Sequence, residues 1–154
     1  MFFIKTIRLS KKYSNENKII LLFDATISAP CLYPLLYCMG SLRFQSIATQ
    51  QSDLLAIKTW YDFWFKKYKT IFCESFITSG YDPEIYLSEI DNFIVFLENN
   101  KKLENNLIRI RANSDINYMT ITQRIRSLFK YFNYLLDEYW NVWNQDLTLK
   151  EITN

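Results

Sequence analysis

Residues 120–139 read TITQRIRSLFKYFNYLLDEY, and this stretch predicts an amphipathic helix. Apolar residues recur in it with the 3.6-residue period of an α-helix: Ile121, Ile125, Leu128, Phe129, Phe132, Leu135, Leu136 and Tyr139. The N-terminal half of the stretch carries hydroxyl, amide and cationic side chains, and no acid precedes Asp137 within it. One side of this helix therefore packs against a core, while the rest suits a phosphate backbone and base edges.

An N-terminal β-hairpin is expected from two short runs that are rich in β-branched and aromatic residues. The first run is FFIKTIRL at residues 2–9, the second is KIILLF at residues 18–23, and a polar connector separates them. Beyond the hairpin, Pro30 and Pro34 oppose regular structure locally, although residues 32–39 could form a short helix.

Two amphipathic helices are expected between this hairpin and the final helix. The first begins near Thr49, a fair N-cap residue, and continues to about Ile77 before Gly80 stops it. The second opens at Asp82-Pro83-Glu84, with proline at the first helical position, and ends in the polar run ENNKK. The final helix begins at about Tyr118, and residues 107–112 (LIRIRA) could be a short strand or a turn of helix.

The expected fold class is mainly α, with four to five helices preceded by a small N-terminal β-hairpin. Two glycines and three prolines in 154 residues leave few forced turns, which favours helices over a many-stranded sandwich. Residues 1–45 would hold the hairpin and its connector, residues 46–143 the helical domain, and residues 144–154 the start of a linker.

Composition excludes several kinds of chemistry. The chain has no histidine, which removes His-ligated metal sites and His-assisted nucleophiles, and its three cysteines follow no metal or redox spacing. We therefore expect no cofactor, no metal, and buried or inert thiols in a reducing cytoplasm. Residues 19–39 are apolar, but Asp24, Pro30 and Pro34 interrupt them, so we expect no membrane span.

Charge is distributed unevenly along the chain, although the net charge is only +2. Residues 70–100 contain six acids and no Lys or Arg, whereas residues 101–130 contain seven bases and two acids. A nucleic-acid binder needs a basic face rather than a basic average. The segregation is therefore compatible with DNA binding despite the small net charge.

Two helix heads supply the candidate contacts to DNA. Each combines hydroxyl and amide side chains with a base, and helix N-termini also attract phosphate. The candidates are Thr49, Gln50 and Lys58 on the first long helix and Thr120, Thr122, Gln123, Arg124, Arg126 and Lys130 on the last.

Each pattern has a plainer interpretation. Spacing alone favours ordinary capped and solvated helix faces, because amphipathic helices with a few bases are common. The aromatic run YDFWF at residues 61–65 could stack on single-stranded bases, but its helical spacing favours the core. The bases of the loop, Lys101, Lys102, Arg109 and Arg111, could bind phosphate or lie on a solvated connector. The acids between residues 74 and 98 mostly avoid the apolar stripe and are expected on a solvated outer face.

The order of these helices resembles a known family. IATQQSDLLAIKTWYDFWF (47–65) is followed by an acidic helix of the form I..FI.FL (90–97) and then by T-x-x-x-R-I-x-S-L-F-K-x-F-x-Y-L (120–135). The arrangement is similar to the N-terminal core-binding domain, a SAM-like helical bundle, of tyrosine recombinases and phage-type integrases. The match covers about residues 43–140, and residues 99–117 are longer than the family pattern.

The resemblance implies a function and a set of partners. A core-binding domain clamps one face of double-stranded DNA, while a C-terminal catalytic domain of the same chain holds the other face alongside further recombinase protomers. The family's catalytic Arg, Lys, His and Tyr set is absent from this chain, so the resemblance implies a non-catalytic DNA-binding fragment. The main alternative is a helical protein–protein interaction module of a phage or mobile-element accessory protein.

Overall fold

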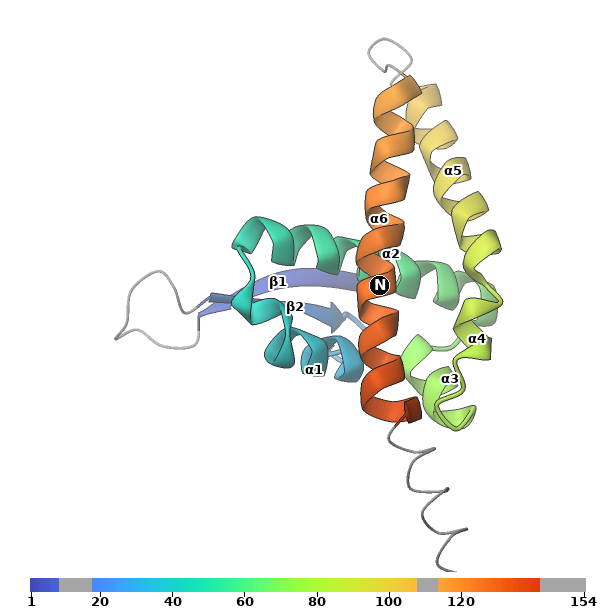
Figure 1. The fold of residues 1–154 in the computed structure, drawn as a ribbon. Coiled ribbons are helices and arrows are strands. Elements are labelled where there is room, and N and C mark those ends of the chain that lie inside the picture. The colour runs from blue at the N-terminus through green and yellow to red at the C-terminus, as the bar shows by residue number, and fades with distance from the viewer. Residues whose placement is uncertain (9–17, 108–113, 142–154) are drawn as a thin grey trace, which may run out of the picture.

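The computed structural model describes residues 1–8, 18–107 and 114–141. Within these ranges a small N-terminal sheet packs against a set of helices, the longest of which cross one another (Figure 1). The prediction of a mainly helical fold with an N-terminal hairpin is confirmed.

The sheet is antiparallel. Strand β1 (Phe2–Arg8) pairs with β2 (Lys18–Asp24) in a register that runs from Phe2 opposite Asp24 to Arg8 opposite Lys18. A two-residue strand, β3 (Ala29–Pro30), pairs with the end of β2 and was not predicted. The strand order is β1-β2-β3, which leaves β1 at one edge of the sheet.

The helices follow in chain order. Between the short helix α1 and α2 lies one 3₁₀ turn, and α6 ends in a π-helical turn. Their bounds are α1 (Leu32–Gly40), η1 (Leu42–Phe44), α2 (Ile47–Tyr68), α3 (Phe72–Thr78), α4 (Glu84–Leu87), α5 (Ile90–Leu107), α6 (Ser114–Leu135) and η2 (Leu136–Trp140). The short helix expected at residues 32–39 is present as α1.

The predicted bounds of the first long helix were wrong at both ends. The α2 cap is Ser46, whose hydroxyl accepts the backbone N–H of Thr49, so Thr49 lies inside the helix. The helix stops at Tyr68 because Lys69 takes a left-handed conformation with φ of 60°. The expected continuation towards Ile77 is therefore a separate helix, α3.

The bounds of the later helices also differ from the prediction. Asp82-Pro83-Glu84 opens only the single turn of α4, with Pro83 at the N-cap, and α5 begins afresh at Ile90. Helix α5 runs through the polar ENNKK segment to Leu107, and α6 begins at Ser114, before the expected Tyr118. The alternative structures proposed for residues 107–112 fall mainly on 108–112, outside the described residues.

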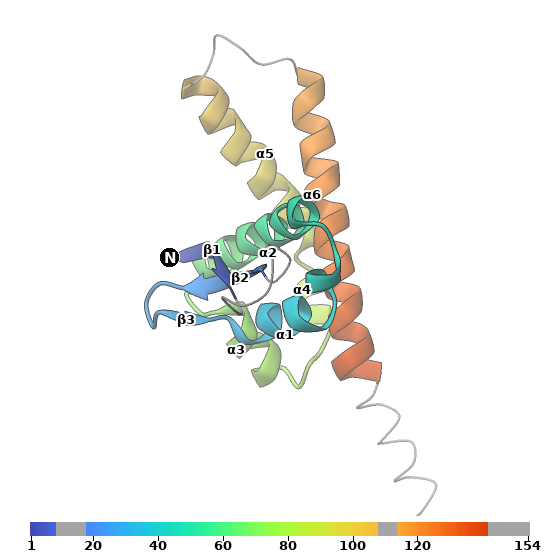
Figure 2. The same cartoon turned by 90° about the vertical axis from the view of Figure 1, so that its left-hand side faces the viewer.

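Helix α2 lies between the other two layers of the fold. Figure 2 shows α6, α2 and the sheet in succession. On one side of α2, the ring of Trp60 contacts Phe132 of α6 with centroids 5.1 Å apart. On another side, the ring of Tyr61 contacts Phe2 of β1 with centroids 5.6 Å apart. The sheet and α6 therefore pack on different faces of the same helix.

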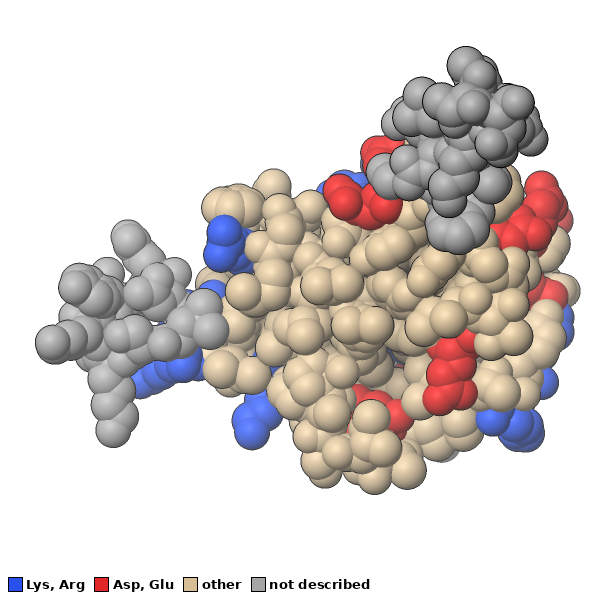
Figure 3. Space-filling view, turned by 90° about the horizontal axis from the view of Figure 1, so that it is seen from below, with Lys and Arg blue, Asp and Glu red and all other residues tan. Residues whose placement is uncertain are grey.

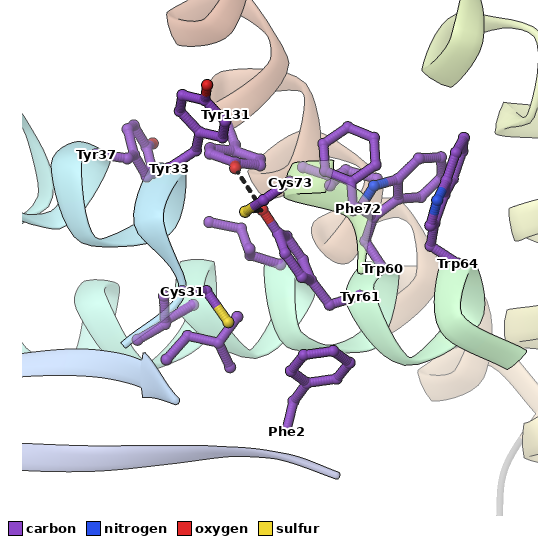
Figure 4. Close-up of a cluster of buried hydrophobic side chains, with 14 of the residues drawn as sticks. Phe2, Cys31, Tyr33, Tyr37, Trp60, Tyr61, Trp64, Phe72, Cys73 and Tyr131 are labelled. Carbon is purple, nitrogen blue, oxygen red and sulfur yellow. Dashed lines mark hydrogen bonds between the residues drawn. The ribbon is translucent and has the colours of Figure 1, made fainter. Parts of the chain in front are cut away.

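One aromatic core joins all three layers (Figure 4). It includes Phe2, the buried β2 residues and side chains of α2, α3, α5 and α6, so residues on both sides of the proposed 45/46 boundary share it. The run at residues 61–65 supplies buried Tyr61, Phe63 and Trp64, which confirms that these aromatic side chains belong to the core. Aromatic edge-to-face pairs at such distances add to the stability gained from burial.

Polar atoms of the core are mostly paired. The Tyr61 hydroxyl lies 2.9 Å from the Tyr131 hydroxyl and 3.1 Å from Cys73 Sγ. Burial raises the pKa of both phenols well above their ordinary value, so the two hydroxyls stay protonated and can hydrogen-bond. The Trp60 indole N–H, by contrast, is buried without an acceptor within the described residues.

The three cysteines are reduced and buried, as expected from their spacing. Burial raises the pKa of Cys31 and Cys38 to about 12, which keeps these thiols protonated and unreactive. Within the described ranges, no His/Cys/Asp/Glu group of three or more is arranged to hold a metal ion. No described helix combines the length and apolarity that crossing a bilayer requires.

Candidate nucleic-acid interface

Helices α2 and α6 are joined by polar contacts at their crossing point. The Asp53 carboxylate on α2 is 2% exposed and accepts a 2.6 Å hydrogen bond from the Ser127 hydroxyl of α6. Its second oxygen lies 3.5 Å from Lys130 Nζ, whose side chain is 56% exposed. These contacts join α6, beyond its midpoint, to the second turn of α2, and Figure 1 shows the two helices crossing.

The head of α2 is capped rather than open. The Ser46 hydroxyl accepts the Thr49 N–H and lies 2.9 Å from the Thr49 hydroxyl, so Thr49 is engaged in capping. Gln50 is 3% exposed, and its amide N–H donates to the Gln45 carbonyl. The prediction of Gln50 as a surface contact is therefore wrong, because this side chain lies in the interior.

Lys58 does not share a surface with the head of α6. It follows Asp53 by five positions, which at about 100° per residue places it about 140° around α2. Phe65, two turns further on, has roughly the same bearing and contacts Phe2 of β1 at 6.4 Å between centroids. Lys58 thus lies towards the sheet, where its ammonium pairs with Asp62 at 2.7 Å. Lys58 and Arg124, both predicted as DNA contacts, therefore do not lie on one surface.

The middle of α6 carries two arginines without a described side-chain partner. Gln123 and Arg126 are exposed and Arg124 is half-buried, and none of their three side chains makes a hydrogen bond or ion pair with any described residue. Thr122 is also half-buried, and its hydroxyl donates to the Tyr118 carbonyl one turn earlier. Thr120 is half-buried and has an interaction of its own. Of the predicted contacts on α6, only the side chains of Gln123, Arg124 and Arg126 thus lack a partner among the described residues.

Other candidate groups fall inside the core or outside the description. Tyr131 is buried, whereas Tyr118 is 76% exposed, so the aromatic residues of α6 do not form a single apolar surface patch. The side chains of the loop bases (Lys101, Lys102, Arg109 and Arg111) lie outside the described residues. Their proposed roles therefore stay predictions.

Two acids have structural roles that were not predicted. Glu89 was expected in solvent, and Asp53 was not among the candidate residues. Glu89 is 9% exposed and accepts hydrogen bonds from Lys67 and Tyr68 of α2, each at 2.5 Å, and from Asn92 at 3.0 Å. The prediction of a solvated Glu89 was therefore wrong. For Asp53, one signal was present in the sequence: it occupies the inner stripe of α2, four positions before Ile57, where an unpaired charge would be costly.

Comparisons with protein-family models, with curated proteins and with solved structures found no match. The functional assignment therefore rests on the chemistry and geometry of the described residues, together with the resemblance noted from the sequence.

Proposed function

We propose that this chain binds double-stranded DNA as the N-terminal clamp domain of a site-specific recombinase or integrase, without catalysing strand exchange itself. The observation that carries the proposal is the set of unpaired side chains on α6, Gln123, Arg124 and Arg126, beside the α2–α6 crossing. Arginine and glutamine bind phosphate oxygens and the hydrogen-bonding edges of bases.

The interface proposed here is narrower than the one expected from the sequence. It comprises the middle of α6 around Gln123, Arg124 and Arg126, and it excludes the buried Gln50 and the sheet-facing Lys58. Lys130 contributes positive charge, although Asp53 offsets part of it at 3.5 Å. Binding of this kind is mainly electrostatic, so we expect it to be weak in isolation and to fall steeply with added salt.

The remaining parts of the proposal follow from the family resemblance. The partners would be a C-terminal catalytic domain of the same parent chain and further recombinase protomers on the DNA. No cofactor is needed for such a clamp. The chain by itself would form no covalent protein–DNA adduct, and detection of one in a denaturing gel would contradict the non-catalytic assignment.

The test compares cations on the two sides of α2. In fluorescence-anisotropy titrations of a labelled duplex, Arg124→Ala and Arg126→Ala should each weaken binding and lower the salt slope by about 0.9 for each lost phosphate contact. Lys58→Ala is the matched control, because it removes the same charge from the sheet side and should bind like wild type. Equal binding by all four proteins would refute the proposal.

A second candidate function is supported by one observation. Helix α1 carries no charged residue, and Leu32, Leu36 and Met39 along its outer side are 48%, 40% and 38% exposed. Seen from below, most of this face consists of uncharged side chains (Figure 3). A protein-interaction module would lose its partner on Leu36→Asp and keep it on Arg126→Ala, whereas a DNA clamp would lose duplex binding only on Arg126→Ala.

A further inference from the structure

The outer edge of β1 has unpaired backbone groups at a defined spacing. The Ala25 N–H donates to the Met1 carbonyl at 2.7 Å, which continues the β1–β2 register and identifies Met1 and Ala25 as a hydrogen-bonded pair. Such pairs alternate along an antiparallel ladder, so the odd-numbered residues of β1 bond to β2. The even-numbered residues, Phe2, Ile4, Thr6 and Arg8, therefore direct their N–H and C=O groups to the outer edge.

No described residue covers these groups. None of the backbone or side-chain hydrogen bonds in the described ranges reaches the backbone of Ile4, Thr6 or Arg8. Thr6 and Arg8 are exposed and Ile4 is half-buried, so this edge is accessible from Ile4 to Arg8, whereas Phe2 is buried. The opposite edge of the sheet differs, because β3 pairs with the end of β2 and Cys31 donates to the Leu22 carbonyl there. An open edge strand can pair with an added strand.

The charges on β1 select the strand that would pair there. Lys5 is exposed, and its backbone forms a hydrogen-bonded pair with Leu21 of β2. Opposite a strand added at the outer edge, Lys5 would therefore stand in a non-hydrogen-bonded pair, the kind in which the two side chains lie closest. Arg8 adds a second exposed cation, and β1 has no acid. Pairing β1 with a second copy would bring the cations of both copies into one sheet, with no acid on either strand to offset them, which is unfavourable. An acid opposite Lys5 would be favourable.

We propose that the outer edge of β1 binds an extended acidic segment of another protein, which adds to the sheet as a fourth strand with a carboxylate opposite Lys5. Main-chain hydrogen bonds to Ile4, Thr6 and Arg8 supply the affinity, and Lys5 and Arg8 supply the charge preference. This inference is independent of DNA binding, because it involves neither α6 nor the head of α2.

The test uses a labelled, acetylated and amidated peptide as long as β1, seven residues, with alternating Val and Glu. A peptide with alternating Val and Lys is its charge-reversed control. Fluorescence anisotropy should show saturable binding of the acidic peptide to the full chain and none of the basic peptide. Absence of acidic-peptide binding, or equal binding of both peptides, would overturn the proposal.

Two variants at one position separate the backbone contact from side-chain effects. Thr6→Pro removes an outward N–H and leaves the Lys5–Leu21 and Ile7–Ile19 bonds intact, so the hairpin persists. It should weaken peptide binding at least about fivefold, the loss expected for one backbone hydrogen bond. Thr6→Ala keeps the N–H and should bind like wild type. If Thr6→Pro, with an unchanged circular dichroism spectrum, binds as well as Thr6→Ala, the edge is not the binding site.

A charge exchange tests the choice of partner. Lys5→Glu should reverse the preference, so that the basic peptide binds in place of the acidic one, and an unchanged preference would contradict the role of Lys5. Sedimentation velocity tests whether a second copy of this chain occupies the edge instead. If the wild-type chain dimerises and Thr6→Pro makes it monomeric, the edge pairs with a second copy, and the acidic partner is wrong.

Discussion

Replacing Ser127 by alanine tests the contact that joins α2 to α6. The Ser127 hydroxyl donates at 2.6 Å to a carboxylate that is 2% exposed, and the only other described partner of Asp53 is Lys130 at 3.5 Å. Ser127→Ala therefore leaves a buried charge with one long contact to a half-exposed ammonium. Hydrogen bonds to charged groups contribute about 1.5–3 kcal/mol, so we expect a loss of that size. For a chain of this length, this corresponds to a fall of roughly 3–12 °C in Tm.

Urea unfolding followed by far-ultraviolet circular dichroism measures this loss directly. Ser52→Ala is the matched control, since Ser52 is exposed beside Asp53 and its hydroxyl makes no hydrogen bond with the described residues, and it should change stability by less than about 0.5 kcal/mol. Asp53→Asn combined with Ser127→Ala removes the charge as well and should restore part of the stability. If Ser127→Ala unfolds at the same urea concentration as Ser52→Ala, the crossing contact contributes nothing and the reasoning is refuted.

Three further predictions concern stability and reactivity. Burial raises the pKa of Glu89, but its hydrogen bonds from Lys67, Tyr68 and Asn92 outweigh this and lower the pKa below 4.5. The stabilisation that ionised Glu89 contributes is thus fully present above pH 4.5 and is lost as the pH falls below it. The difference in urea midpoint between wild type and Glu89→Gln should therefore become smaller below about pH 4.5. Leu128→Ala should cost about 2–5 kcal/mol in urea unfolding, because Leu128 is fully buried. All three thiols should react with a thiol reagent only after unfolding, and fast labelling of the native chain would contradict their burial.

The elements that could be predicted from the sequence are those whose signals are local. The hairpin follows from two β-rich runs around a polar connector, and the inner side of α6 follows from its apolar period. The end of α2 could not be predicted, because it depends on Lys69 in a left-handed conformation that usually favours glycine or asparagine. The start of α2 was misplaced by three residues because Ser46 and Thr49 are both good caps, and either could have begun the helix.

The candidate site was harder to predict because its polar groups depend on partners that are distant in the chain. Glu89 lies off the apolar stripe, yet Lys67 and Tyr68 of α2 donate hydrogen bonds to it from about twenty positions earlier in the chain. Asp53 finds its hydrogen-bond donor 74 positions away in Ser127. Helical periodicity gives the side of α2 on which Lys58 lies, but only the packing of the sheet and α6 shows that this side faces the sheet rather than α6.

The position of α2 between the sheet and α6 has a consequence for how the protein can be shortened. A truncated chain starting at residue 46 would retain every helix from α2 onward, but it would expose to water the rings of Tyr61 and Phe65 that Phe2 now covers. It would also leave Tyr131 and Tyr134 without Tyr37, their neighbour on α1. The helical half is thus not self-sufficient: the first 45 residues act as part of its interior, and removing them should yield an aggregating product rather than a smaller folded domain.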